Sequence, residues 1–151
     1  MSTQSELLTW GSAQLKELST DSGGASPTAE ARYLLAWALG VDSLLRAPLE
    51  VSPIAEASYR TAVMKRAGRI PRSHVTGQMY FRGLKLDAGA GVFTVRPETE
   101  MLVEHVLELI SKDGIPEGEW VDLCSGSAAI ALSLSLEKKH HVTAVEVDPS
   151  A

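Results

Sequence analysis

Hydrophobic positions in residues 1–75 recur every three or four residues, which is the spacing of one face of a helix. Three helices are predicted, with apolar positions Leu7, Leu8, Leu15 and Leu18 in the first, Tyr33, Leu34, Trp37 and Ala38 in the second, and Ile54, Ala57, Thr61, Met64 and Ala67 in the third. The turn Asp21-Ser22-Gly23-Gly24 would close the first helix. Aromatic side chains at helical spacing usually fill a core. Residues 1–75 are therefore predicted to form a small helical bundle, with Trp10, Tyr33 and Trp37 in its core.

Capping residues mark the ends of the second and third helices. Ser26-Pro27 and Ser52-Pro53 each place a capping serine before a proline at the first helical position. Gly40 and Gly68 are predicted to end these two helices. Asp42 would cap a short turn between them.

Polar and apolar residues alternate from Gln78 to Leu86, which predicts paired β-strands that turn at Arg82-Gly83. We interpret residues 76–96 as a β-hairpin linker. Pro97 then begins a predicted helix. The buried stripe of this helix would contain Leu102, Val106, Leu109 and Ile110. Its outward face would contain Glu98, Glu100, Glu104 and Glu108.

Two apolar runs near the end of the chain are each followed by a small or an acidic residue. Trp120–Leu123 leads into the small-residue loop Cys124–Ala128 and then into a helix rich in alanine and leucine. The second run, Val142–Val145, is followed by Glu146, twenty residues after Gly126. Adjacent parallel strands would bring the loop and this carboxylate to one edge of a sheet, where a ribose diol can bind. The pattern predicts half of a nucleotide-type cofactor site, although a plain strand–turn–helix of any α/β protein remains open.

The spacing of small residues discriminates between cofactors. A dinucleotide fingerprint needs Gly-x-Gly-x-x-Gly, whereas the register from Gly126 reads Gly-Ser-Ala-Ala-Ile-Ala, which disfavours a nicotinamide or flavin enzyme. The pattern Asp-x-Gly-x-Gly-x-Gly of S-adenosylmethionine methyltransferases fits better, with Cys124 and Ala128 in place of two glycines. A left-handed Ala128 would cost about 1–2 kcal/mol. The predicted cofactor contacts are Asp122, Cys124, Ser125, Gly126, Ser127, Ala128 and Glu146.

A more specific string lies upstream, from Gly91 to Glu104, and contains Arg-Pro-Glu-Thr-Glu at residues 96–100. With it, the chain resembles the HemK/PrmC family, the glutamine-N5 methyltransferases that modify peptide-chain release factors. The resemblance extends over nearly the whole chain: the helical region, the segment Pro71–Leu84, the Arg-Pro-Glu-Thr-Glu string and the loop occur in the family's order. Departures are Val95 in place of the usual proline, Glu146 in place of aspartate, and Ala128 in place of glycine.

The resemblance implies a fold, a cofactor and a partner. The fold would be an N-terminal helical bundle, a β-hairpin linker and the start of a Rossmann-like class I methyltransferase domain over residues 97–151. The cofactor would be S-adenosyl-L-methionine. The partner would be a peptide-chain release factor, which residues 1–75 would help to recognise. The Arg-Pro-Glu-Thr-Glu segment would border the cofactor pocket, or it would be a helix start and hinge only.

The family's Asn-Pro-Pro-Tyr motif, which holds the substrate glutamine, does not occur in the 151 residues. We therefore expect no catalytic residue in this chain. We interpret it as the N-terminal part of a longer enzyme, with an incomplete, truncated cofactor domain. An alternative is a non-catalytic partner-binding module that acts alone.

Composition narrows the remaining possibilities. The chain is 44% hydrophobic and 22% charged, has a net charge of -5 and contains one cysteine, so it has no internal disulfide. It shows no signal peptide and no apolar run near the length of about 20 residues that a membrane span needs. A cytoplasmic location without membrane contact is expected. The histidines lack partners at metal-ligand spacing, so no metal site is predicted.

Charge is unevenly distributed. No acidic residue lies between Glu56 and Asp87, a stretch that contains Arg60, Lys65, Arg66, Arg69, Arg72, Arg82 and Lys85. This stretch could face an acidic partner or ribosomal RNA, or it could be a solvated helix end. The acidic net charge argues against nucleic acid as a direct ligand.

Overall fold

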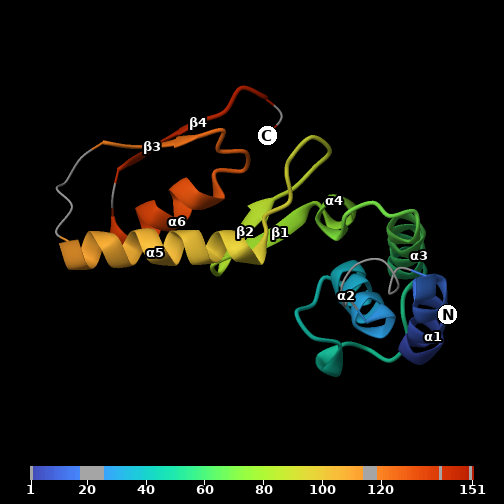
Figure 1. Cartoon of the computed structure of the whole chain (residues 1–151). Coiled ribbons are helices and arrows are strands. Elements are labelled where there is room, and N and C mark those ends of the chain that lie inside the picture. Colours follow the sequence, from blue (N-terminus) through green and yellow to red (C-terminus); the bar gives the residue numbers. More distant parts are fainter. Residues whose placement is uncertain (1, 18–25, 114–118, 140, 150) are drawn as a thin grey trace. The chain divides into compact units, whose positions relative to one another are not determined.

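The computed structural model describes residues 2–17, 26–113, 119–139, 141–149 and 151. Packing of the backbone divides the chain into two compact units, Met1–Thr76 and Gly77–Ala151 (Figure 1). Each unit has its own cluster of buried side chains. The predicted hairpin falls within the second unit.

The first unit is helical. Its elements are α1 (Gln4–Gln14), α2 (Pro27–Leu39), the short 3₁₀ helix η2 (Leu44–Arg46), α3 (Pro53–Ala67) and α4 (Arg72–Thr76). A capping box begins α1: the Thr3 hydroxyl accepts from the Glu6 N–H, and the Glu6 carboxylate accepts from the Thr3 N–H at 2.8 Å. The bundle predicted for this region is confirmed as a packed set of helices.

Most predicted helix ends are confirmed. Ser52 caps α3 by accepting from the Ala55 N–H at 3.3 Å, and Gly40 ends α2 in the left-handed conformation with φ of 66°. Ser26 precedes α2 but makes no capping hydrogen bond through its side chain. The prediction that Asp42 caps the next turn is wrong, because the neighbouring Ser43 accepts from the backbone of η2. Leu18 and the turn at residues 21–24 lie outside the described residues.

The core of the first unit brings α1, α2 and α3 together. Its fully buried side chains include Leu7, Leu15, Leu34, Leu35, Tyr59 and Val63. The Tyr59 hydroxyl donates to the Leu7 carbonyl at 3.1 Å, which satisfies the one polar atom of this large side chain. Trp10, Tyr33 and Trp37 are half-buried and pack against the core. They cover the core rather than fill its centre.

The buried face of α3 differs from the predicted one. Ile54 is 82% exposed and Met64 is 55% exposed, whereas Tyr59 and Val63 are fully buried. The predicted face lies beside the true one. The helix contacts both α1 and α2, and these neighbours decide which of its apolar positions are covered.

The second unit begins with the hairpin β1 (Gln78–Phe81) and β2 (Leu84–Asp87), which pair antiparallel as predicted. Arg82 and Gly83 have φ of 45° and 78°. Two successive left-handed residues make a turn whose twist matches the strands, and glycine at the second position is favoured there. Met79, Phe81 and Leu86 direct one face of the hairpin into the core.

Two helices and two strands complete the second unit: α5 (Pro97–Asp113), β3 (Trp120–Leu123), α6 (Ala129–Lys138) and β4 (Val142–Val145). The strands are parallel, with Trp120 opposite Val142 and Leu123 opposite Val145. Helix α6 contacts α5 as well as both strands (Figure 1). The predicted β–α–β order is confirmed, but each sheet of the described structure has two strands, and a Rossmann-like domain stays a prediction.

The predicted buried stripe of α5 is partly wrong. Val103 and Leu107 are its buried residues, whereas Leu102 and Leu109 are 53% and 49% exposed. Apolar residues cover a wide arc of this helix, and the hairpin and α6 pack against only part of that arc. Val106 and Ile110 are half-buried at its edge.

Among the described helices none is both long enough and apolar enough to cross a membrane.

Candidate functional site

The candidate site lies where the two parallel strands end. Parallel strands place their carboxyl ends at the same edge of a sheet, so the loop after β3 and the residue after β4 become neighbours. The Ser125 N–H donates to the Val145 carbonyl at 3.1 Å, which extends the pairing one residue into the loop. Local strand pairing thus fixes the position of the whole 124–128 loop.

The loop has an alternating left-handed backbone. Cys124, Gly126 and Ala128 have φ of 57°, 53° and 57°. These are the three positions at which the methyltransferase pattern has glycine. Two residues with a Cβ therefore adopt a conformation that costs roughly 1–2 kcal/mol each. The Ala128 N–H donates to the Ser125 carbonyl at 2.8 Å and closes the loop before α6 begins.

Glu146 reaches this loop from the end of β4. Its Oε2 accepts a hydrogen bond from the Gly126 N–H at 2.8 Å, and its Oε1 accepts from the N–H groups of Val147 and Asp148 at 2.7 and 3.0 Å. The backbone N–H groups of Asp148, Gly126 and Val147 stabilise the ionised carboxylate and lower the pKa of Glu146. The predicted convergence of Gly126 and Glu146 is found in the structure.

Asp122 contacts the helix that follows the loop. Its Oδ2 accepts from the Ala131 N–H in the first turn of α6 at 3.1 Å. The residue at the N-cap of this helix is Ala128, whose side chain cannot accept a hydrogen bond. Asp122 supplies that missing cap from β3 and so holds the strand, loop and helix together.

A cavity of about 610 Å³ adjoins the loop. Gly126, Ser127 and Ala128 line it, whereas Asp122, Cys124, Ser125 and Glu146 are not among its lining residues. The structure thus brings three of the seven predicted contacts to the cavity wall. Cys124 is exposed. The sequence predicts no role for it other than contact with the cofactor.

The opposite wall of the cavity was not predicted. It consists of Lys85, Leu86, Asp87, Ala88, Gly89 and Val92 from the end of the hairpin and the segment after it, with Leu132 from α6 and Ala151. A signal for this wall exists in the sequence: strand β2 is followed by the small-residue run Ala88-Gly89-Ala90-Gly91. Small residues permit close approach of the backbone to a ligand. At Gly89 and Gly126 an added Cβ would meet no atom within 4 Å.

The amino-acid sequence of the chain is similar to proteins of one family. The model of the PrmC N-terminal domain matches residues 6–77. Proteins named release factor glutamine methyltransferase are similar along most of the chain. The one from Streptomyces coelicolor is 40% identical over 142 residues, which is 92% of this chain and 50% of the relative. Residues 6–77 thus match the PrmC N-terminal domain, and most of the chain is similar to release factor glutamine methyltransferases.

Two further relatives with the same name are also similar to most of the chain. The Bifidobacterium longum protein is 38% identical over 152 residues, covering 96% of this chain and 50% of the relative. The Deinococcus radiodurans protein is 35% identical over 150 residues, covering 97% and 52%. The chain spans about half the length of the curated relatives it matches.

Proposed function

We propose that this chain belongs to an S-adenosyl-L-methionine-dependent enzyme that methylates the glutamine of the Gly-Gly-Gln motif in peptide-chain release factors. In this proposal the first unit helps to recognise the release factor, and residues 97–151 contribute half of the cofactor site. The match to the PrmC N-terminal domain and the names of the relatives support the reaction class.

The observation that carries the cofactor assignment is the hydrogen bond between Gly126 and Glu146. It joins two strand ends at the edge where parallel α/β sheets bind nucleotides. An oxidoreductase with a dinucleotide cofactor is not favoured, because the loop keeps one of the three fingerprint glycines.

The residues present fit an adenosine-containing ligand. The adjoining cavity, about 610 Å³, falls in the range of roughly 300–1,000 Å³ that is usual for small-molecule sites. Its loop wall is built from glycine, serine and alanine, which leave the backbone accessible. The Glu146 carboxylate, which its hydrogen bond with the Gly126 N–H holds beside this wall, would accept hydrogen bonds from ribose hydroxyls.

S-adenosyl-L-methionine would supply a methyl group activated by a sulfonium. The residues of this chain would hold it in place: Ser127 and Ala128 against the cavity, and Asp122 behind them through α6. A glutamine amide nitrogen is a poor nucleophile because its lone pair is delocalised. It therefore must be held about 3–3.5 Å from the methyl carbon, in line with the breaking bond. The motif that would hold the amide is absent from these residues, so we assign no catalytic residue here.

The first test measures methyl transfer. The protein that contains this chain together with any sequence its gene encodes beyond it is incubated with a release factor and labelled donor. We expect one methyl group on the Gly-Gly-Gln glutamine. Absence of label there, in a folded protein, would reject the proposed substrate.

The second test separates the cofactor site from a pure partner-binding module. Calorimetry of the 151-residue chain should detect donor binding, and Glu146→Gln should weaken it by about tenfold through loss of a charged acceptor. Glu50→Gln is the matched control, because Glu50 is exposed and belongs to the first unit, outside the cofactor loop and the Arg-Pro-Glu-Thr-Glu segment. Unaltered donor affinity in Glu146→Gln would reject the role of Glu146. No donor binding by the chain or the full product of the gene would favour the module.

A further inference from the structure

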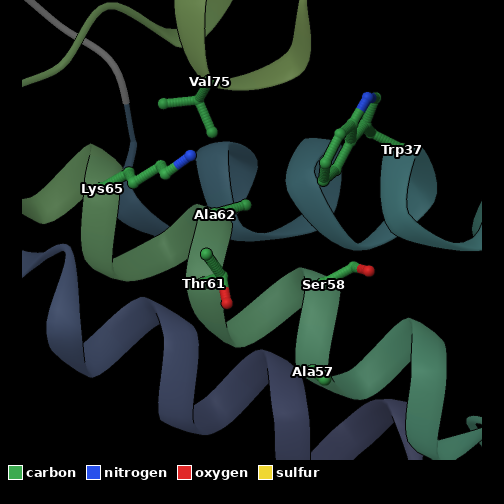
Figure 2. Close-up of a pocket in the computed structure, with 7 residues that line it drawn as sticks. All are labelled: Trp37, Ala57, Ser58, Thr61, Ala62, Lys65 and Val75. Carbon is green, nitrogen blue, oxygen red and sulfur yellow. The ribbon is translucent and has the colours of Figure 1, made fainter.

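A second hollow lies in the first unit. Helices α2, α3 and α4 enclose a groove of about 330 Å³ (Figure 2). Its floor is Ala62, which is 2% exposed, and Ala57 lies farther along the same helix. Space remains because α3 has only methyl side chains at these two positions, opposite the large ring of Trp37.

Trp37 forms a fixed wall of this groove. Its indole N–H donates to the Thr76 carbonyl at 3.1 Å, which ties α2 to the end of α4. The ring is thereby held with its polar atom satisfied and part of its apolar surface free. Val75 of α4 contributes a second apolar wall (Figure 2). A pre-ordered aromatic surface binds apolar side chains at low entropic cost.

The polar rim comes from one face of α3. Ser58, Thr61 and Lys65 are spaced three and four residues apart and so lie along the same side of the helix. Within the described residues the structure gives the side chains of these three no hydrogen-bond or ion-pair partner. In the view of Figure 2, Lys65 and Trp37 stand at opposite ends of the groove.

Three arginines of α3 and α4 are paired with acids. Arg66 and Arg72 both pair with Glu30, at 2.7 and 3.2 Å, and Arg60 pairs with Glu56 at 2.9 Å. Among the residues that the structure describes, no acidic side chain lines the groove. The lysine ammonium at its rim therefore has no counter-ion within that part of the chain, and it lies next to an apolar wall and two hydroxyl groups.

We propose that this groove binds an acidic segment of a partner protein, with a carboxylate at Lys65 and a neighbouring apolar side chain against Trp37. A single lysine suits one carboxylate, whereas a nucleic-acid backbone calls for a stripe of several cations, and the chain as a whole carries a net charge of -5. The inference rests on the proposed function where it identifies the partner with the release factor.

The first experiment uses a fluorescein-labelled peptide of alternating glutamate and leucine, with a lysine–leucine peptide of the same length as the reversed-charge probe. The 151-residue chain should bind the acidic peptide and not the basic one. Nuclear magnetic resonance should show a shift of the indole N–H of Trp37 and none of Trp10. Binding of both peptides equally, or a shift confined to Trp10, would overturn the proposal.

Variants locate the interaction. Lys65→Glu should weaken binding of the acidic peptide by about tenfold, the effect of placing like charges together. Ala57→Phe should weaken it as well, by filling the groove from an exposed helix position. Arg32→Glu is the matched control: it makes the same charge change at an exposed residue of α2 that does not line the groove. Circular dichroism verifies that each variant is folded.

Release-factor binding by the full product of the gene distinguishes the two proposals. If the release factor binds and neither Lys65→Glu nor Ala57→Phe weakens it, the groove proposal fails while the proposed function stands. If the acidic peptide binds through Lys65 but release factor is neither bound nor methylated, the proposed function fails while the groove proposal stands. Tight binding of oligouridylate that Lys65→Glu abolishes would replace the acidic segment with RNA and overturn the proposal.

Discussion

At the scale of single residues, the 124–128 loop has a left-handed backbone at alternate positions, including two residues that carry a Cβ. Cys124 and Ala128 adopt left-handed φ of 57°, as does Gly126 with 53°. Hydrogen bonds from Ser125 to Val145 and from Gly126 to Glu146 hold the loop at fixed points on both strands. These contacts keep the loop in one shape even where its residues disfavour that shape.

Replacing Ala128 with glycine should therefore stabilise α6. The change removes a strained Cβ and supplies a better N-cap residue, so the free energy of local opening should rise by about 1 kcal/mol. Amide hydrogen exchange in α6 measures this free energy. A fall in protection would mean that Ala128 is not left-handed.

The matched control is the same substitution in ordinary helix. Ala57 lies inside α3 and is exposed, so Ala57→Gly should lower the free energy of opening of α3 by about 1 kcal/mol. Ala128→Gly should thus raise the free energy of local opening, whereas Ala57→Gly should lower it. A change in the same direction for both variants would contradict the argument from the left-handed φ of Ala128.

At the scale of elements, Arg82 joins the hairpin to both long helices of its unit. Its Nε contacts Glu137 of α6 at 2.6 Å, and its Nη2 contacts Glu104 of α5 at 2.9 Å. The backbone N–H of Arg82 also donates to the Glu100 carboxylate at 3.0 Å. The carboxylates of Glu137 and Glu104 raise the pKa of Arg82, and that guanidinium in turn lowers the pKa of Glu137. The arginine side chain is 16% exposed.

Arg82→Ala should destabilise the second unit by about 1–2 kcal/mol, because it removes charge-assisted hydrogen bonds between a largely covered guanidinium and partly exposed carboxylates. Urea unfolding followed through Trp120, in a protein where Trp10 and Trp37 are phenylalanine, measures this unit. Lys112→Ala breaks one exposed pair with Glu108 at 3.3 Å and should change stability by less than about 0.5 kcal/mol. Equal effects of the two changes would show that the network adds nothing.

At the scale of the whole molecule, the described residues form two cores that share no side chain. The first contains buried residues from Leu7 to Val63, and the second contains buried residues from Met79 to Leu134. The second unit also exposes large apolar side chains, including Leu123 at 69% and Val147 at 92%. Stability should therefore differ between the units.

A protein of residues 1–76 should fold alone. Its core is complete within those residues, so its cooperative urea transition should have the same midpoint as the first unit has in the full chain. A protein of residues 77–151 should bind a hydrophobic dye more strongly than a protein of residues 1–76 does, because exposed apolar surface binds such dyes. Failure of residues 1–76 to show a cooperative transition would contradict the division into two units.

The sequence was sufficient for features whose causes are local. Ser52-Pro53, Gly40 and Arg82-Gly83 each specify a backbone conformation within a few residues, and the helices and hairpin they predict are present. Burial was predicted less well. The true faces of α3 and α5 differ from the predicted ones because each helix has more apolar positions than its neighbours cover.

For the candidate site, sequence alone determined that Gly126 and Glu146 would meet, because parallel pairing of two short strands leaves the following residues at one edge. Tertiary structure alone decided that Asp122 caps α6, that the hairpin end forms the opposite wall of the cavity, and that Trp37 and Lys65 share a groove. The physical reason is the separation along the chain of the residues that interact. Caps, turns and strand order depend on hydrogen bonds between near or paired residues, whereas a cavity wall depends on how distant elements pack.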